Sequence, residues 1–461
     1  MKGLRDGELE TAGEMAAALP AGEVTSVELV QRALRRAEAW QPSINAFSQL
    51  WADQAMELAE RTDATPVEER VALAGIPIAV KDLYDVAGKE TTGCCAAYRG
   101  TIAERDAPVI ERLTRAGLVM IGKTNQHELA AGGTNLVSAC GRTGNPWDPD
   151  RMTGGSSGGS GAAVAAGVVP WALGSDTGGS VRIPASMCGI FGVKPTTGRL
   201  PTEGLMPLAP SMDCPGPMAS NLEDLELLDS LMAGAPFSPE PLSTARRLRL
   251  GVPDGFFVDR IHDEVLEAVR TVGGVFESAG VTIAPVDGTG LENVRSLWMR
   301  VCGVEFFEAH PLLRNPERRR QVGPSVLEWL DLGERQTDPD RAEAVREREQ
   351  VGRWFWQRLE SLDALLIPTT PYPAPRADQE TVDLGKAGTV EVSHVGPGWI
   401  TCSVNLAGLP AISLPGGRST DGMPIGVSLV AKDGQEGVLF GLARAWAAAS
   451  GYRTERPSIP A

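Results

Sequence analysis

The most constraining stretch of this chain is residues 152–187, where two loops rich in glycine and serine flank a run of small and apolar residues. The first loop spans residues 154–161, and the second spans residues 176–180. Between them, residues 162–167 are predicted to form a short helix and residues 168–173 a strand. Each loop can direct backbone N–H groups and a serine hydroxyl into one place. The stretch therefore predicts a site that binds a carbonyl oxygen or a phosphate.

Outside this stretch, predicted helices and strands alternate along the chain. Residues 73–80 are apolar on both faces, which is typical of a buried strand in a parallel or mixed sheet, and Lys81 follows at once. Thr25 and Glu28 have the spacing of a capping box. The alternation indicates an α/β fold with a large mixed sheet.

The other predicted elements follow helical or strand periodicity. Helices are expected at residues 9–19, 25–39, 53–61, 108–116, 222–232, 263–279, 291–310, 340–362 and 436–450, with a helix start at 127–131. Strands are expected at residues 119–121, 191–193, 248–252, 365–367, 411–414 and 425–430. Residues 145–150 are predicted to be a rigid loop, and residues 235–245 a connection between two halves.

The charge balance narrows the classes of partner. The chain has 43 Lys and Arg against 59 Asp and Glu, and a net charge of −16 argues against a general nucleic-acid surface or a basic membrane patch. Seven cysteines without a CxxC pair do not make a disulfide framework. No apolar run has the length of a membrane span, and the first residues lack a signal-peptide pattern. We therefore expect a cytoplasmic protein.

Phosphate and metal sites are poorly supported by the motifs. A Walker A loop needs a lysine after its second glycine, whereas Ser160 follows Gly159 here. No GxGxxG pattern opens a helix after a strand, so a dinucleotide fingerprint is also missing. His127 begins a pattern like HExxH, but Ala131 occupies the position of the second histidine. We expect no metal and no cofactor.

A nucleophile elbow is a further interpretation, because residues 154–158 match GxSxG and would make Ser156 the nucleophile. An elbow serine directly follows a strand, however, and residues 147–153 are polar and interrupted by proline. The mechanism also needs a downstream histidine, and no recognisable site context surrounds His262, His310 or His394.

A serine mechanism without histidine fits the second loop better. Ser180 follows the predicted strand 168–173 by a short turn, where backbone N–H groups lack partners and a helix dipole favours negative charge. The N–H groups of Thr177, Gly178 and Gly179, together with that of Ser180, are expected to stabilise a developing oxyanion.

Lys81 is the candidate base for this mechanism. A lysine accepts a proton only when it is neutral, and burial at the end of a core strand lowers its pKa. The alternatives are an ordinary ion-paired lysine and a glycine linker in the first loop. The combination of two such loops with a lysine from a core strand favours the catalytic interpretation.

These residues resemble the amidase signature family. The matching segments are residues 75–82 (GIPIAVKD), 122–125 (GKTN), 145–148 (NPWD), 154–160 (GGSSGGS), 174–185 (GSDTGGSVRIPA) and 192–196 (GVKPT). A weaker likeness continues through residues 366–369, Asn405, and residues 408–410 and 424–426. The resemblance implies a single α/β/α domain over residues 1–461, with helices on both faces of the central sheet. Its signature core would span residues 75–220, and residues 235–400 would shape the substrate cavity.

The resemblance also implies a catalytic triad. Ser180 would be the nucleophile, Ser156 the bridging serine after a cis peptide bond, and Lys81 the base. Ser157, Asp176 and Arg182 match positions that support this site. The implied reaction is amide hydrolysis through an acyl-enzyme, giving a carboxylic acid and ammonia or an amine.

The substrate stays open between a small amide, glutamine in the glutaminase component of a tRNA-dependent amidotransferase, and a urea derivative as in allophanate hydrolase. A proline-interrupted segment at residues 204–213 favours a stand-alone amidase. The expected partner is a small-molecule amide. Nucleic acid is expected only for a component of an amidotransferase, no membrane is expected, and a homodimer is compatible. Arg295 and Arg300 are candidates for a substrate carboxylate or for solvent-facing charges.

Overall fold

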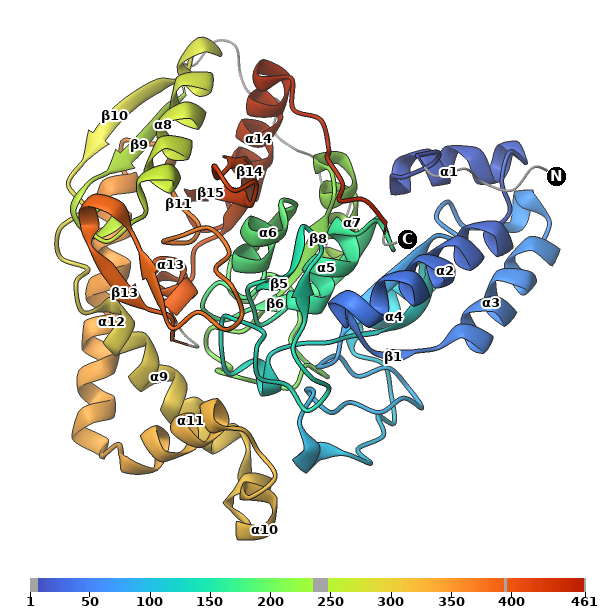
Figure 1. The fold of residues 1–461 in the computed structure, drawn as a ribbon, viewed down its shortest axis with the longest axis horizontal. Coiled ribbons are helices and arrows are strands. Elements are labelled where there is room, and N and C mark those ends of the chain that lie inside the picture. The colour runs from blue at the N-terminus through green and yellow to red at the C-terminus, as the bar shows by residue number, and fades with distance from the viewer. Residues whose placement is uncertain (1–6, 235–247, 394–395, 460–461) are drawn as a thin grey trace.

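One mixed sheet of eleven strands forms the centre of the structure (Figure 1). The computed structural model describes residues 7–234, 248–393 and 396–459. The strands of the sheet are β1 (Phe47–Leu50), β2 (Pro77–Lys81), β3 (Val119–Thr124), β6 (Trp171–Asp176), β7 (Phe191–Lys194), β8 (Cys214–Ala219), β9 (Arg249–Pro253), β10 (Thr282–Val286), β11 (Ala364–Pro368), β14 (Ala411–Arg418) and β15 (Pro424–Ala431).

The sheet combines parallel and antiparallel pairs. Its strand order is β1-β3-β2-β6-β8-β7-β14-β15-β11-β9-β10. Strand β2 is parallel to both β3 and β6, and β9 is parallel to β10 and β11. The other pairs in this order are antiparallel. The predicted large mixed sheet is confirmed.

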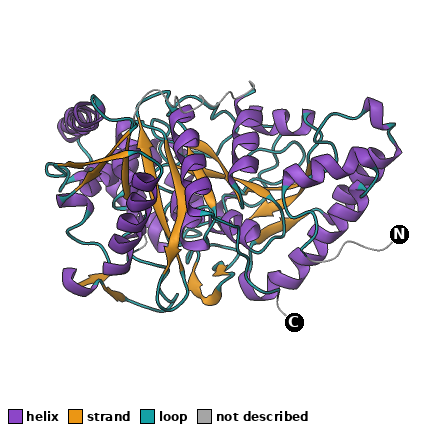
Figure 2. Ribbon diagram, turned by 90° about the horizontal axis from the view of Figure 1, so that it is seen from above, coloured by secondary structure: helices purple, strands orange, loops and turns teal. Residues whose placement is uncertain are grey.

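Helices cover this sheet on both faces, as Figure 2 shows from above. They are α1 (Ala12–Ala21), α2 (Ser26–Ile44), α3 (Ala52–Ala64), α4 (Pro108–Arg115), α5 (Gly158–Ala165), α6 (Arg182–Cys188), α7 (Leu222–Ala233), α8 (Asp263–Ser278), α9 (Val294–Ala309), α10 (Pro316–Arg319), α11 (Pro324–Arg335), α12 (Asp338–Leu359), α13 (Thr401–Ala407) and α14 (Glu436–Ser450).

The side chains of the strands alternate between the two helical layers, as a period of two requires. On β6, Ala172 belongs to the same apolar cluster as α5, whereas Trp171 and Leu173 belong to the cluster of α7. On β7, the ring of Phe191 lies 6.3 Å from that of Trp446 in α14. Strands that are buried on both faces need the continuous apolar runs seen in the sequence.

The start of α2 confirms the predicted capping box. The hydroxyl of Thr25 accepts a hydrogen bond from the backbone N–H of Glu28, and the Glu28 carboxylate accepts one from the Thr25 N–H. The helix then continues to Ile44, five residues beyond the predicted end. Helix α14 has the bounds that the sequence predicts.

Several segments differ from the sequence-based expectation. Helix α5 spans Gly158–Ala165 rather than 162–167, and strand β6 spans Trp171–Asp176 rather than 168–173. Residues 145–150 were expected to be a rigid loop, but Gly144–Asn145 (β4) and Asp148–Met152 (β5) form a small hairpin. Residues 127–131 form one 3₁₀ turn, Glu128–Ala130, rather than a helix, because Leu129 and Ala130 adopt φ angles of 49° and 58°.

Strand β8 was not predicted, because its proline and glycine residues mask the strand periodicity. A second hairpin joins β12 (Thr381–Asp383) to β13 (Thr389–Glu391). The expected connection at residues 235–245 and His394 lie outside the described residues. Within the described part of the chain, no helix has the length and apolarity to cross a membrane.

Candidate active site

Two parallel strands bring the candidate residues to one edge of the sheet. Lys81 is the last residue of β2, and Asp176 is the last residue of the neighbouring strand β6. Their register pairs Val80 with Leu173, so the carboxyl ends of both strands meet. A lysine and the second glycine–serine loop thus emerge side by side, as the sequence order alone could not establish.

Lys81 contacts two serine hydroxyls in a fully buried setting. Its Nζ lies 2.7 Å from Ser156 Oγ and 2.9 Å from Ser175 Oγ. Among the described residues no carboxylate lies within ion-pair distance of Lys81, so its contacts are hydroxyl groups. Burial lowers the pKa of Lys81 from 10.5 to about 7, although the more distant charges of Asp176 and Asp213 oppose the shift. Near neutral pH this amine can exist unprotonated.

Lys123, a second buried lysine on the neighbouring strand, has a carboxylate partner, which Lys81 lacks within the described residues. Lys123 lies on β3, and its Nζ forms an ion pair with Asp82 at 3.4 Å. Two lysines at adjacent strand ends therefore have different partners. If Lys81 were an ordinary ion-paired lysine, it would be expected to contact a carboxylate. Of the two lysines, only Lys123 does so in the described part of the chain.

The first loop holds Ser156 against this lysine. The Gly155–Ser156 peptide bond is cis, as the family resemblance implied. The backbone carbonyl of Ser156 accepts a hydrogen bond from the His127 N–H at 3.0 Å. Gly159 packs so closely that a Cβ would lie 2.4 Å from the carbonyl oxygens of Ala46 and Asn125. This close approach explains why the loop and the start of α5 consist of glycine and serine.

Ser157 joins the first loop to the second. Its hydroxyl donates to the Ser175 carbonyl at 3.3 Å and accepts from the Ser175 N–H at 3.2 Å. Its backbone N–H donates to the carbonyl of Ser180 at 3.2 Å. The two loops thereby lie in direct contact. Ser156 is fully buried, whereas Ser180 keeps 7% of its surface exposed, so Ser180 is the serine that a ligand can reach.

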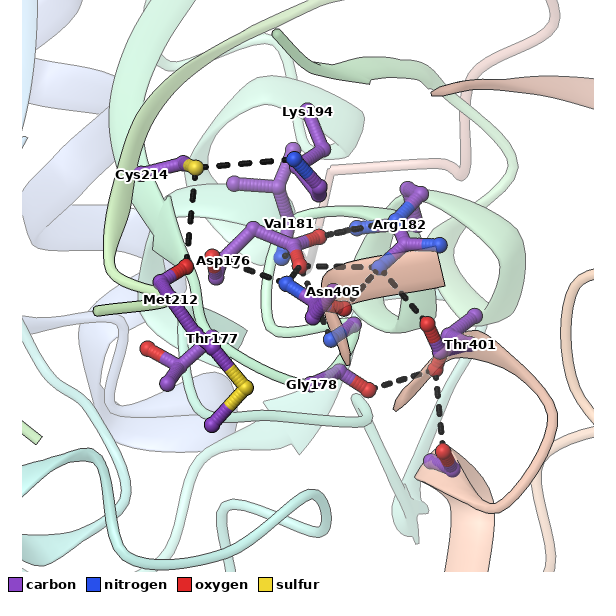
Figure 3. Close-up of polar contacts among 12 residues, drawn as sticks. Asp176, Thr177, Gly178, Val181, Arg182, Lys194, Met212, Cys214, Thr401 and Asn405 are labelled. Atoms are coloured by element: carbon purple, nitrogen blue, oxygen red, sulfur yellow. Dashed lines mark hydrogen bonds and ion pairs between the residues drawn. The ribbon is translucent and has the colours of Figure 1, made fainter. Parts of the chain in front are cut away.

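The second loop is shaped by the buried carboxylate of Asp176 (Figure 3). Its oxygens accept hydrogen bonds from the backbone N–H groups of Gly179 at 2.9 Å and of Val181 at 3.2 Å. The Arg182 guanidinium donates to both oxygens, at 3.0 and 2.9 Å. Asn405 from α13 donates to the same carboxylate at 2.9 Å. One residue thus determines the path of the loop from β6 into α6.

Charge pairing explains how a carboxylate tolerates this burial. Burial by itself disfavours the charged form, but the Arg182 guanidinium and the Asn405 amide together hold the pKa of Asp176 well below its usual range. Arg182 in turn donates to Asn405 Oδ1 at 2.6 Å. Hydrogen bonding to the charged carboxylate therefore keeps Asp176 ionised in this buried setting.

Side chains of helices α9 and α13 hold the second loop by donating hydrogen bonds to two of its backbone carbonyl groups. Trp298 Nε1 in α9 donates to the Thr177 carbonyl at 3.0 Å, and the Thr401 hydroxyl donates to the Gly178 carbonyl at 2.6 Å. Among the described residues, the N–H groups of Thr177, Gly178 and Ser180 have no hydrogen-bond partner. The Gly179 N–H, which we also expected to bind an oxyanion, instead donates to Asp176. Three donors therefore remain free around the turn.

The structure adds four residues around the site that were not predicted from the sequence to belong to it: Ser175, Asn405, Thr401 and Trp298. Ser175 lies in the matching segment 174–185, and its position one residue before the end of β6 is the signal that places it beside a lysine from β2. The other three come from helices more than 100 residues further along the chain. Asn405 falls within the weaker family likeness, which gave it no role. No local pattern marks Thr401 or Trp298, because they reach the loop only through tertiary packing.

His262 and His310, the two described histidines considered as candidate bases, have partners other than Ser156 and Ser180. Both ring nitrogens of His310 are engaged, Nδ1 with the Tyr98 hydroxyl at 2.7 Å and Nε2 with the Pro207 carbonyl at 2.8 Å. Burial lowers the pKa of His310 to about 4. His262 accepts from the Glu264 N–H at the start of α8. In the described ranges, no group of three or more His, Cys, Asp or Glu side chains has the geometry of a metal site.

This geometry combines three chemical capacities in one place. A buried amine can accept a proton through hydroxyl groups, a partly exposed serine can reach a ligand, and free backbone N–H groups can stabilise a negative oxygen.

Comparisons with known proteins show that the chain is similar to amidases and to amidotransferase A subunits. A family model described as Amidase matches residues 28–440. The A subunit of the glutamyl-tRNA(Gln) amidotransferase of Rhodopirellula baltica is 34% identical over 496 residues, covering 97% of this chain and 98% of that protein.

Solved structures show the same similarity in three dimensions. A crystal structure described as amidase matches with a TM-score of 0.89 at 33% identity, covering 95% of this chain and 99% of the other. The structure of 6-aminohexanoate cyclic dimer hydrolase complexed with substrate matches with a TM-score of 0.84 at 29% identity, covering 98% and 99%.

Proposed function

The chain belongs to the amidase family and hydrolyses amide C–N bonds, and from this premise we propose that it does so through an acyl-enzyme on Ser180. The observation that carries the proposal is the fully buried Lys81 amine, which contacts the hydroxyls of Ser156 and Ser175 and has a pKa of about 7. A buried cation without a carboxylate would be costly, whereas a neutral amine there is a base.

In the acylation step, Ser180 Oγ attacks the amide carbonyl carbon. The Ser180 proton moves to Ser156, and the Ser156 proton moves to the neutral Lys81 amine. The carbonyl oxygen becomes an oxyanion, which the free N–H groups of Thr177, Gly178 and Ser180 stabilise. Lys81 returns its proton through Ser156 to the leaving nitrogen, the C–N bond breaks, and ammonia or an amine departs.

Deacylation uses the same groups with water as the nucleophile. Water passes a proton through Ser156 to Lys81 as it attacks the acyl carbon, and Ser180 regains a proton when its ester bond breaks. The products are a carboxylic acid and the free enzyme. Asp176, Arg182 and Ser157 act as positioning residues, because their hydrogen bonds hold the two loops in contact.

The direct test is ammonia release from a panel of primary amides by the purified chain alone. We expect turnover of at least one amide, and the Ser180→Ala variant should reduce it by roughly a thousandfold or more, as for removal of other serine nucleophiles. Ammonia release that survives in Ser180→Ala would contradict the proposed nucleophile. A purified chain that hydrolyses no amide of the panel would argue against a stand-alone amidase.

A second candidate function is glutamine hydrolysis within an amidotransferase. The observation in its favour is the full-length similarity to amidotransferase A subunits, including that of Chloroflexus aurantiacus at 36% identity. Under this alternative, ammonia should form from glutamine, and partner subunits should increase the rate. The stand-alone proposal instead requires turnover of another amide at a rate that added amidotransferase subunits do not change.

A further inference from the structure

A cavity of about 310 Å³ is lined in part by helix α9 and by the segment before α13, and it contains two arginines without carboxylate partners. Its lining includes Arg260, Arg295, Tyr372, Ser393 and Trp399. In the described part of the chain, neither arginine forms an ion pair with Asp or Glu. An unneutralised pair of guanidinium groups in one concave site favours an anion.

Helix α9 connects this cavity to the proposed oxyanion site. Arg295 and Trp298 are three residues apart, so they lie on the same face of α9, separated by about 5 Å along its axis. Trp298 donates to the Thr177 carbonyl, as described above. A group bound at Arg295 is therefore about one helical turn from the residue that holds the loop.

The segment before α13 makes a second connection. Trp399 lines the cavity, and Thr401, two residues further on, donates to the Gly178 carbonyl at 2.6 Å. A Cβ on Gly398, at the start of this segment, would lie 3.1 Å from that same carbonyl. The cavity and the oxyanion loop are thus on the two sides of one short segment.

Tyr372 supplies a polar group that has no function within the fold. Its side chain is 1% exposed, and its hydroxyl has no hydrogen-bond partner among the described residues. A Cβ on Gly396 would lie 2.8 Å from this hydroxyl, so glycine leaves the space in front of it open. A buried hydroxyl without a partner costs free energy, which a bound acceptor would recover.

The arginines are held in place without being neutralised. Arg295 donates to Ser393 Oγ at 2.9 Å, and Arg260 lies over the Trp399 ring at 5.5 Å. The one acidic lining residue, Glu391, is exposed. Arg300 differs, because its guanidinium pairs with Glu347 at 2.5 Å. Of the two arginines considered from the sequence, only Arg295 is available for a ligand.

We propose that this cavity binds a carboxylate of the substrate, so that the enzyme prefers amides carrying a second, anionic end. The proposal rests on the amide hydrolysis proposed above and adds the class of substrate. The planar guanidinium of Arg295 can donate two parallel hydrogen bonds to a carboxylate, Arg260 adds charge, and the Tyr372 hydroxyl can donate a third bond. The scissile carbonyl then lies at Thr177–Ser180.

The test compares monoamides of linear dicarboxylic acids, in a series of chain lengths, with neutral amides in which a methyl group replaces the carboxylate. We expect a higher kcat/KM for the carboxylate member at the matching length. Arg295→Gln should reduce this preference by roughly 10- to 100-fold, the loss typical of a hydrogen bond to a charged group. Tyr372→Phe, which removes only the hydroxyl, should reduce it by a smaller factor.

Arg300→Gln is the matched control, because it removes an arginine of the same helix outside the cavity. It should leave the preference unchanged. Equal kcat/KM values for both members of every pair in the wild-type enzyme would overturn the inference. The inference would also be overturned if Arg295→Gln lowered kcat/KM by the same factor for the carboxylate amide and for its neutral partner, so that the preference stayed unchanged.

A binding measurement separates this inference from the proposed function. In the Ser180→Ala variant, calorimetric titration should show tighter binding of the carboxylate monoamide than of its neutral partner, and the added Arg295→Gln change should abolish the difference. If no amide is hydrolysed but this difference is found, the proposed reaction fails and the anion site stands. If the difference is absent, the anion site is refuted whatever the turnover.

Discussion

Replacing Lys81 by methionine tests the central feature of the site, a lysine kept neutral by burial. Methionine has a similar length and is apolar, so it fills the space without a charge. Turnover should fall by roughly a thousandfold or more, because the variant has no base for Ser180. The wild-type kcat/KM should rise with pH through about 7, as the amine loses its proton.

The pKa of Lys81 also predicts how the free energy of unfolding changes with pH in the wild type and in Lys81→Met. The unfolded chain keeps Lys81 protonated up to about pH 10.5, whereas the folded chain releases that proton near pH 7. Between these values the unfolded state binds more protons, so a rise in pH stabilises the wild-type fold. Below about pH 7 both states bind the proton, and this stabilisation is lost. The pKa shift from 10.5 to about 7 corresponds to about 5 kcal/mol of unfolding free energy. Methionine has no such dependence.

The assay is the free energy of unfolding from urea titrations of both proteins at several pH values. From about pH 7 to about pH 9, the wild type should gain about 2 kcal/mol relative to Lys81→Met. Hydrogen bonds lost with the lysine add an offset that does not change with pH, so the slope is the informative quantity. Lys432→Met, at an exposed lysine, controls for the loss of one positive charge.

Two results would refute this reasoning. A free-energy difference between wild type and Lys81→Met that is constant over the pH range would mean that the buried lysine keeps its proton. A Lys81→Arg enzyme with near-normal turnover would exclude a lysine base, because arginine stays charged at every accessible pH.

Three further predictions concern the surrounding groups. A fluorophosphonate should label Ser180, and Ser156→Ala should slow this labelling without moving it; an adduct mapped to Ser156 would support the nucleophile-elbow interpretation. Arg182→Met should destabilise the fold by about 3–5 kcal/mol in urea unfolding, because it leaves Asp176 charged and buried, and an unchanged midpoint would show that the pair is dispensable. Incubation with a chelator should leave turnover unchanged, whereas a loss that zinc restores would require a metal-dependent mechanism.

The sequence was most informative where local chemistry is restrictive. Apolar runs predicted the buried strands β2 and β15, and cap spacing predicted the start of α2, because burial on two faces and helix ends each demand particular residue types. Elements without such a signal were missed. Strand β8 contains two prolines and a glycine, and it is a strand because β6 and β7 flank it on both sides.

For the site, the sequence by itself indicated the candidate residues. The second glycine–serine loop and a lysine at the end of a core strand pointed to Ser180 and Lys81, and the family resemblance added Ser156 as the bridging serine. Only the tertiary structure decided their environment. The parallel pairing of β2 with β6 places Lys81 between two hydroxyls instead of beside a carboxylate, and Asp176 takes the Gly179 N–H out of the expected set of donors.

The cavity with Arg260 and Arg295 was decided by the tertiary structure alone. Its lining comes from segments between residues 260 and 399, and Arg295 and Arg300 look alike in the sequence. Packing of α9 gives one of them a glutamate partner and leaves the other facing a cavity. Local sequence specifies reactive groups, because chemistry depends on residue type, whereas charge neutralisation and burial depend on neighbours that folding brings from far along the chain.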